Sequence, residues 1–244
     1  MAIILILLIC GTVNLVTAQV ADFLYPFNHL SSQLRIVGGQ DASAKQFPFQ
    51  TGLYISYQLK SAFCGGSLIS ENYVLTAAHC LEGALSINVV LGALNISDES
   101  EPGRQSQTTT SYTIHPQWDS SYYKNDVGVV RLSSPAILNE YVQKITVASG
   151  VDTYANQQGT VIGWGKTYDD QQTLTDILQY VSNKIYREGN KGFCQGDSGG
   201  PLISNGVQVG IVSFSYKSCQ VSMPSVFARV SEFSEWIKDN TDIV

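Results

Sequence analysis

Short segments that are apolar or alternate between apolar and polar residues recur along the chain from residue 36 onward. They are rich in Val, Ile, Tyr and Phe, and turn residues such as Gly, Ser and Asn repeatedly interrupt them. Segments of this length and composition are typical of β-strands, so the chain is predicted to form an all-β barrel or sandwich. These segments are "FQTGLYISY" (49–57), "GGSLIS" (65–70), "YVLTAA" (73–78), "SINVVLGAL" (86–94), "DVGVVRL" (126–132), "GTVIGWG" (159–165), "VQVGIVSF" (207–214) and "SVFARV" (225–230).

Helical spacing of apolar residues occurs only near the C-terminus, in "SEFSEWIKDN" (231–240). Phe233, Trp236 and Ile237 share one helical face there, and Ser231 is expected to be the N-cap. A chain of 244 residues with 44% hydrophobic content can bury a sizeable core. We therefore expect one β-rich unit whose two halves each form a small barrel.

The first residues predict a secretory signal peptide. Residues 2–10, "AIILILLIC", are an unbroken apolar run, and "VTAQ" suits cleavage after Ala18. A transmembrane anchor is the alternative, but the run is too short to span a bilayer and has no flanking basic residues. Residues 1–18 are thus predicted to be removed from a secreted protein that is not held in a membrane.

Loss of the signal peptide would also remove Cys10 and leave an even number of cysteines. Four cysteines in an oxidising compartment predict two disulfides, with three connectivities open. A zinc site is not expected, because there is no CxxC pair and few histidines accompany the cysteines. The net charge of −6 argues against a nucleic-acid partner. The remaining cysteines are Cys64, Cys80, Cys194 and Cys219.

Ser198, in "GDSGG", is a candidate nucleophile. The motif formally fits the nucleophile elbow of α/β-hydrolases, but that fold needs a histidine after the serine, and none follows here. A serine needs a histidine base, and the histidine needs a carboxylate to orient it. His79 and Asp126 meet these needs in the order His, Asp, Ser. Taken singly each has an ordinary structural explanation, whereas together they favour catalysis.

The motifs resemble those of the trypsin/chymotrypsin-type serine proteases, and they follow that family's order across residues 36–244. The resemblance implies two six-stranded antiparallel β-barrels with a short C-terminal helix, and an active site between the barrels. It implies protein or peptide substrates and no cofactor or metal. The motifs are "RIVGG" (35–39), "CGGSLIS" (64–70), "LTAAHC" (75–80), "NDVGVVRL" (125–132), "GWG" (163–165), "CQGDSGGPL" (194–202), "GIVSF" (210–214) and "VFARV" (226–230).

The same resemblance assigns catalytic roles. Ser198 would attack the scissile carbonyl, His79 would act as base and then as acid, and Asp126 would orient the imidazole. The backbone N–H groups of Gly196 and Ser198 would form the oxyanion hole. Ser213 matches the family's serine that hydrogen-bonds the catalytic aspartate, and segment 213–215 would pair with the substrate backbone.

Activation by proteolysis is also implied. Cleavage after Arg35 would free the ammonium group of Ile36, which would pair with the carboxylate of Asp197. Without the resemblance, Arg35 would be an ordinary exposed arginine in a linker. Residues 19–35 would be a propeptide that leaves, since it contains no cysteine. A trypsin-like activating protease, protein inhibitors and a monomeric state are further expectations.

The resemblance implies a primary specificity pocket lined by Gly192, Ser215 and Ser225, beside Phe214. None of these is acidic, so a basic substrate side chain would be buried without a counter-charge. The expected preference is therefore apolar, as in chymotrypsin or elastase.

One segment departs from the family pattern. Residues 182–193 are about half as long as the usual connection to the nucleophile cysteine and lack its disulfide. In the family, the full-length connection supports the pocket and the activation site, both of which must be held accurately. The alternative to an active endopeptidase is therefore a protease-like binding or regulatory protein with little activity, and a splice form or gene-model error would also explain the shortening.

Two features lie outside this pattern. Asn95, in "NIS", is a glycosylation sequon in a polar loop, with an unused surface asparagine as the alternative. The acidic stretch "SDESE" (97–101) is expected to be a solvated cluster, with calcium binding as the alternative.

Overall fold

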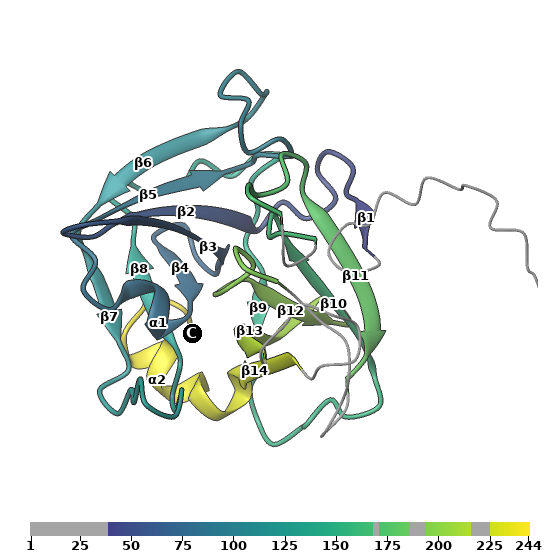
Figure 1. Ribbon diagram of the computed structural model, residues 1–244. Helices are drawn as coiled ribbons and strands as arrows, with labels where there is room; N and C mark the ends of the chain where they lie inside the picture. Colours follow the sequence, from purple (N-terminus) through teal and green to yellow (C-terminus); the bar gives the residue numbers. More distant parts are fainter. Residues whose placement is uncertain (1–38, 168–170, 186–193, 216–224) are drawn as a thin grey trace, which may run out of the picture. The chain divides into compact units, whose positions relative to one another are not determined.

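The structure is a computed structural model that describes residues 39–167, 171–185, 194–215 and 225–244. Figure 1 shows two curled sheets within this part of the chain. The predicted all-β class and the short C-terminal helix are confirmed.

The first sheet has the antiparallel order β6-β5-β2-β3-β4-β8-β7. Its end strands, β6 and β7, are separated by only two residues in the chain, so the sheet must curl until its edges approach. The sheet has seven strands where six were predicted, because residues 110–111 separate β6 from β7. The strands are β2 (Gln50–Ser56), β3 (Ser61–Leu68), β4 (Tyr73–Thr76), β5 (Ser86–Leu91), β6 (Gln105–Thr109), β7 (Tyr112–Ile114) and β8 (Gly128–Arg131).

The second sheet has the order β1-β11-β10-β12-β13-β14, and the two-residue strand β9 pairs in parallel with β13. All its other pairings are antiparallel. The strands are β1 (Gln40–Asp41), β9 (Thr146–Val147), β10 (Gln158–Gly163), β11 (Gln179–Lys184), β12 (Pro201–Ser204), β13 (Val207–Ser215) and β14 (Ser225–Arg229).

The apolar residues of the strands form the buried core. Alternate residues of a strand face opposite sides, so Leu53 and Ile55 on β2 both point inward and are fully buried. Ile162 and Ile211 do the same in the second sheet. Each side chain of this size contributes roughly 1.5–3 kcal/mol when it is removed from water.

Direct hydrogen bonds join the two sheets. The buried Ser67 hydroxyl on β3 donates to Gln208 Oε1 on β13 at 2.5 Å. Near it, the Gly65 N–H on β3 donates to the carbonyl of Ser198 at 2.7 Å. The loop that carries the candidate nucleophile is therefore fixed against the first sheet.

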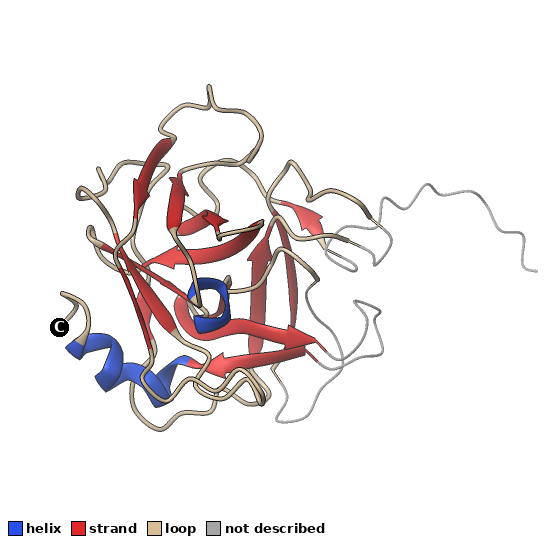
Figure 2. Cartoon of the chain, turned by 60° about the vertical axis from the view of Figure 1, so that its left-hand side comes forward, coloured by secondary structure: helices blue, strands red, loops and turns tan. Residues whose placement is uncertain are grey.

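The C-terminal segment, which Figure 2 shows ending in a helix beside the strands, contacts the end of β7 in the first sheet. A 3₁₀ turn, Val230–Phe233, precedes the helix α2, Ser234–Asp239. The rings of Phe233 and Trp236 lie 5.5 and 5.2 Å from that of His115, which follows β7. The expectation that Ser231 caps the helix was wrong: it lies inside the 3₁₀ turn, and its buried hydroxyl has no hydrogen-bond partner among the described residues.

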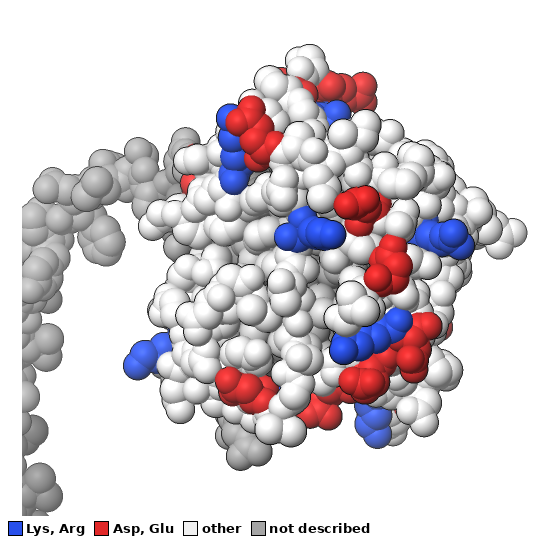
Figure 3. Space-filling model, turned by 180° about the vertical axis from the view of Figure 1, so that it is seen from behind, with Lys and Arg blue, Asp and Glu red and all other residues white. Residues whose placement is uncertain are grey.

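Acidic and basic side chains are interspersed on the face shown in Figure 3. Among the described residues seen there, no continuous basic surface of the kind that a phosphate backbone requires is present. No helix within the described ranges has the length and apolar character needed to cross a membrane.

Candidate active site

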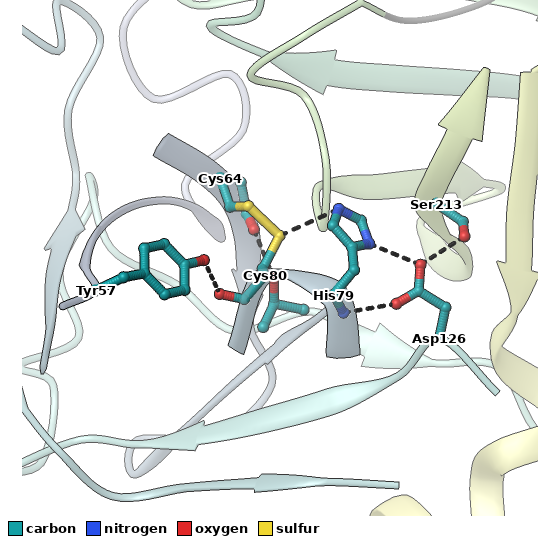
Figure 4. The surroundings of a disulfide bond; sticks show 8 residues. Tyr57, Cys64, His79, Cys80, Asp126 and Ser213 are labelled. Atoms are coloured by element: carbon teal, nitrogen blue, oxygen red, sulfur yellow. Dashed lines mark hydrogen bonds and ion pairs between the residues drawn. A yellow bond between two sulfur atoms is a disulfide. The ribbon is translucent and has the colours of Figure 1, made fainter. Parts of the chain in front are cut away.

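His79 lies in the short helix α1, Ala78–Leu81, which directly follows β4. The sequence suggested a strand end at this point, and the chain instead turns into the helix. The disulfide Cys64–Cys80 joins the helix to β3, and the Tyr57 hydroxyl donates to the Cys80 carbonyl at 2.6 Å. These contacts hold the backbone on which His79 is carried (Figure 4).

Asp126 comes just before β8, and its side chain is only 1% exposed. Its Oδ1 accepts a hydrogen bond from the backbone N–H of His79 at 2.9 Å. Its Oδ2 is hydrogen-bonded to Nδ1 of the same residue at 2.8 Å. The Ser213 hydroxyl donates to Oδ2 at 2.5 Å. A carboxylate accepts hydrogen bonds, so the proton is assigned to Nδ1, and Nε2 then carries the lone pair that a base needs. Figure 4 shows this row from Ser213 through Asp126 to His79.

Two consecutive turns present Ser198. The Asp197 N–H donates to the Cys194 carbonyl at 3.1 Å, and the Gly200 N–H donates to the Asp197 carbonyl at 2.9 Å. Gly196 and Gly199 hold the third position of these turns, with φ of +101° and +77°. Positive φ at that position is the requirement of a type II turn, which glycine meets without strain. The motif "GDSGG" therefore encodes the backbone on which Ser198 sits.

The Ser198 turn lies against the segment that leads into His79. A Cβ on Gly199 would be 2.1 Å from Thr76 Oγ1 and 3.1 Å from the backbone N of Ala77. Among the hydrogen bonds of the described residues, none joins Ser198 Oγ to His79, whose Nε2 lies 3.6 Å from Cys80 Sγ. Hydrogen bonds of this kind often form fully only when substrate is bound.

The backbone N–H groups of Gly196 and Ser198 have no acceptor among the described residues. Both belong to the same pair of turns, while the intervening N–H of Asp197 is used within the first turn. Two free donors beside a serine can stabilise the oxyanion of a tetrahedral intermediate.

Asp197 is completely buried beneath these turns. Its Oδ1 accepts the Gly165 N–H at 2.8 Å, and its Oδ2 accepts the Cys194 N–H at 3.0 Å. Burial raises the pKa of this carboxyl to about 7, because the two hydrogen bonds only partly offset the loss of hydration. The motif "GWG" has a steric reason, since a Cβ on Gly163 or Gly165 would overlap the Asp197 carboxylate.

One edge of the strand segment Ser213–Ser215 pairs with no strand among the described residues. The segment pairs with β14 on its other side, whereas the pairing of β13 with β12 ends at Ile211. A shift of register between Val212 and Phe214 marks a bulge at Ser213, and a bulge can redirect a side chain. Ser225 is the first residue of β14 and pairs with Ser215.

An aromatic cluster beside His79 was missed in the sequence. The ring of Tyr123 lies 5.8 Å from that of His79, 5.0 Å from that of Phe214 and 5.7 Å from that of Trp118. Two consecutive tyrosines shortly before Asp126 were the available signal. The cluster forms an apolar wall next to the imidazole.

Other predicted site residues can be placed as follows. Cys194 is disulfide-bonded, and Asn95 is half-buried with its Oδ1 accepting the Ser97 N–H at 3.0 Å. Cys64, His79 and Cys80 lie close enough to suggest a metal site, but both sulfur atoms belong to the disulfide and are not thiolates. The predictions for Arg35, Ile36, Gly192 and Cys219 fall outside the described residues.

An imidazole oriented by a buried carboxylate, together with a serine whose turns present two N–H donors that lack acceptors among the described residues, is equipped for nucleophilic acyl transfer. Residues 36–237 match the family described as Trypsin. The chain belongs to this family of serine endopeptidases, which act on protein substrates.

Individual relatives agree with this assignment. The chain is 37% identical to a chymotrypsin of Phaedon cochleariae, over 90% of this chain and 88% of the relative. It is 36% identical to a brachyurin of Leptuca pugilator, over 85% and 99%.

Solved structures agree as well. A collagenase designated HL matches with a TM-score of 0.77 and 30% identity, over 85% of this chain and 99% of the other. Human heparin binding protein matches with a TM-score of 0.74 and 28% identity, over 83% and 95%.

Proposed function

We propose that the protein is a secreted serine endopeptidase that is made as an inactive precursor and activated by cleavage after Arg35. The observation that carries the catalytic part is the geometry of Asp126, which is 1% exposed and accepts two hydrogen bonds from His79. A buried carboxylate used in this way fixes both the tautomer and the direction of an imidazole base.

The chemical steps use Ser198, His79 and two N–H groups. Ser198 Oγ forms a bond to the scissile carbonyl carbon while Nε2 of His79 takes its proton, and the N–H groups of Gly196 and Ser198 stabilise the oxyanion. The carbon–nitrogen bond then breaks, and His79 gives the proton to the leaving amine. Water cleaves the acyl-enzyme by the same steps and restores Ser198.

Asp197 supports the activation step. Its carboxylate is fully buried, and no Lys, Arg or His side chain of the described residues pairs with it. A new ammonium group at Ile36 would offset this burial, and its attraction for Asp197 would tie the turn containing Gly196 to cleavage. We therefore assign residues 1–18 to a signal peptide, 19–35 to a propeptide and 36–244 to the protease domain.

We assign substrates with an apolar side chain before the scissile bond. The supporting feature is the edge of Ser213–Ser215 that no described strand pairs with, where a substrate backbone could add as a strand, next to the ring of Phe214. Ser225 pairs with Ser215 at this edge, and neither residue carries a charge for a basic side chain. A trypsin-like protease is the proposed activator, protein inhibitors are proposed partners, and the enzyme is proposed to act as a secreted monomer.

A protease-like binding protein with little activity is the second candidate. Two observations favour it: residues 182–193 form a short connection, and Ser198 has no hydrogen bond to His79 among the described residues. The structurally similar human protein is itself named for heparin binding.

One experiment separates the two functions. Residues 19–244 would be expressed, cleaved after Arg35 with trypsin, and treated with a fluorophosphonate probe, with Ser198→Ala as the control. The endopeptidase proposal expects labelling of the cleaved wild type alone. Folded, cleaved protein that stays unlabelled would favour the binding protein.

We also propose that Asn95 carries an N-linked glycan. The hydrogen bond from Ser97 N–H to Asn95 Oδ1 leaves the side-chain nitrogen without a hydrogen-bond partner among the described residues. Digestion with a glycosidase should lower the mass of the wild type and leave that of Asn95→Gln unchanged.

A further inference from the structure

The loop Leu94–Arg104, between β5 and β6, is closed by two of its own charged side chains. The guanidinium of Arg104 donates to three carbonyls: those of Asn95 at 3.2 Å, Asp98 at 3.1 Å and Ile96 at 3.1 Å. A single guanidinium therefore binds three carbonyls of one turn. Bonds from a charged donor are stronger than those from a neutral one.

Glu101 fixes the other side of the same loop. Its two carboxylate oxygens accept the backbone N–H groups of Leu94 at 2.8 Å and Asn95 at 2.9 Å. Both Glu101 and Arg104 are half-buried. Two side chains of opposite charge thus bind backbone carbonyls and N–H groups of this loop.

The closed loop holds a segment of the second sheet. The Ile96 N–H donates to the Asp176 carbonyl at 2.8 Å, and the Leu178 N–H donates to the Leu94 carbonyl at 2.8 Å. The indole of the buried Trp164 also donates to the Leu94 carbonyl, at 3.1 Å. Residues 94–96 and 176–178 therefore form a small antiparallel contact across the two halves of the fold.

The held segment supports the turn that contains Gly196. The Thr175 N–H donates to the Trp164 carbonyl at 3.0 Å, and the Lys166 N–H donates to the Gln195 carbonyl at 2.8 Å. Leu174 packs on the turn so closely that a Cβ on Gly196 would lie 2.4 Å from Leu174 Cδ2. These contacts connect residues 174–178 to the backbone that carries the Gly196 N–H.

We propose that Arg104 is a positioning residue for the oxyanion donor Gly196, acting through the loop Leu94–Ser97 and the segment Leu174–Leu178. The proposal rests on the proposed function, since it needs Gly196 to serve the reaction. Catalysis depends strongly on accurate donor placement, so the contacts of Arg104 should affect turnover more than substrate binding.

The kinetic test compares three variants of the cleaved enzyme on one apolar peptide substrate. Arg104→Ala should lower kcat about tenfold with KM within about twofold, because a misplaced donor weakens the transition state more than the ground state. Arg104→Lys keeps the positive charge and should recover part of kcat. Arg131→Ala, an exposed arginine on β8 of the first sheet, is the matched control and should leave both constants unchanged.

A second readout does not depend on turnover. In the uncleaved protein carrying Ser198→Ala, Arg104→Ala should speed hydrogen exchange at the Ile96 and Leu178 amides at least about tenfold, because their cross-segment bonds open more often. Unchanged exchange at these amides would overturn the proposal that Arg104 holds the loop Leu94–Ser97 against the segment Leu174–Leu178.

The failures can be told apart. An inactive wild type would contradict the proposed function. An active wild type with equal kcat for Arg104→Ala and Arg131→Ala would contradict the positioning role alone.

Discussion

Because the carboxyl of Asp197 is buried, we predict that the uncleaved protein loses stability as the pH rises. Burial raises its pKa from 3.8 to about 7. Between these values the folded protein binds more protons than the unfolded chain, so the free energy of unfolding falls with increasing pH. The stabilising contribution is complete below about pH 4 and lost above about pH 7. A difference of about three pKa units corresponds to an upper value of roughly 4 kcal/mol.

The assay is urea unfolding of the uncleaved protein with Ser198→Ala, from pH 4 to pH 8, compared with the same protein carrying Asp197→Asn. The asparagine cannot ionise, so subtracting its curve removes the contributions of other groups. The difference between the two proteins should shift in favour of Asp197→Asn as the pH rises to about 7 and then level off. A difference that stays flat across this range would refute the reasoning.

Cleavage after Arg35 gives a second test of the pH dependence assigned to Asp197. If the Ile36 ammonium pairs with Asp197, the carboxylate becomes the favoured form and the pH slope should disappear from the cleaved protein. A slope that persists unchanged after cleavage would show that no cation has reached Asp197.

Two further predictions concern the residues that hold the site. Ser213→Ala removes one donor to the buried Asp126 carboxylate and should lower kcat/KM of the cleaved enzyme about tenfold to a hundredfold, since a bond to a charged group contributes about 1.5–3 kcal/mol. Ser149→Ala, an exposed serine, is the control, and equal activities of the two variants would contradict the role of Ser213. Gly199→Ala should destabilise the protein by roughly 1–3 kcal/mol more than Gly206→Ala in urea unfolding. Both glycines have nearly the same positive φ, +77° and +76°, but a Cβ meets Thr76 Oγ1 only at Gly199. Equal losses would mean that close packing of the Ser198 turn is unimportant.

The sequence predicted the strands that bury apolar side chains, because alternation and composition report directly on burial. The segments at 49–57, 86–94 and 207–214 all correspond to strands. It missed β6 and β7, where Gln, Ser, Thr and Tyr dominate. These two strands form the ends of the sheet order, and half-exposed strands need few apolar residues.

The candidate site was found through residue type and chain order, which singled out His79, Asp126 and Ser198. The contacts of Tyr123 and Arg104 could not be read in this way. Each depends on loops that meet only after folding, and a loop tyrosine or arginine has no pattern that identifies its partner. Local sequence also misled the assignment of Ser231. Its residue type favours a helix cap, but Ser231 lies within the 3₁₀ turn that precedes α2.

The central claim is that cleavage after Arg35 turns Ser198 into a nucleophile activated by His79. The most direct measurement is the rate of fluorophosphonate labelling before and after trypsin cleavage of residues 19–244. The account predicts labelling of the cleaved wild type, much slower labelling of the uncleaved protein, and none of Ser198→Ala. Absence of labelling in folded protein with a free Ile36 N-terminus would contradict it.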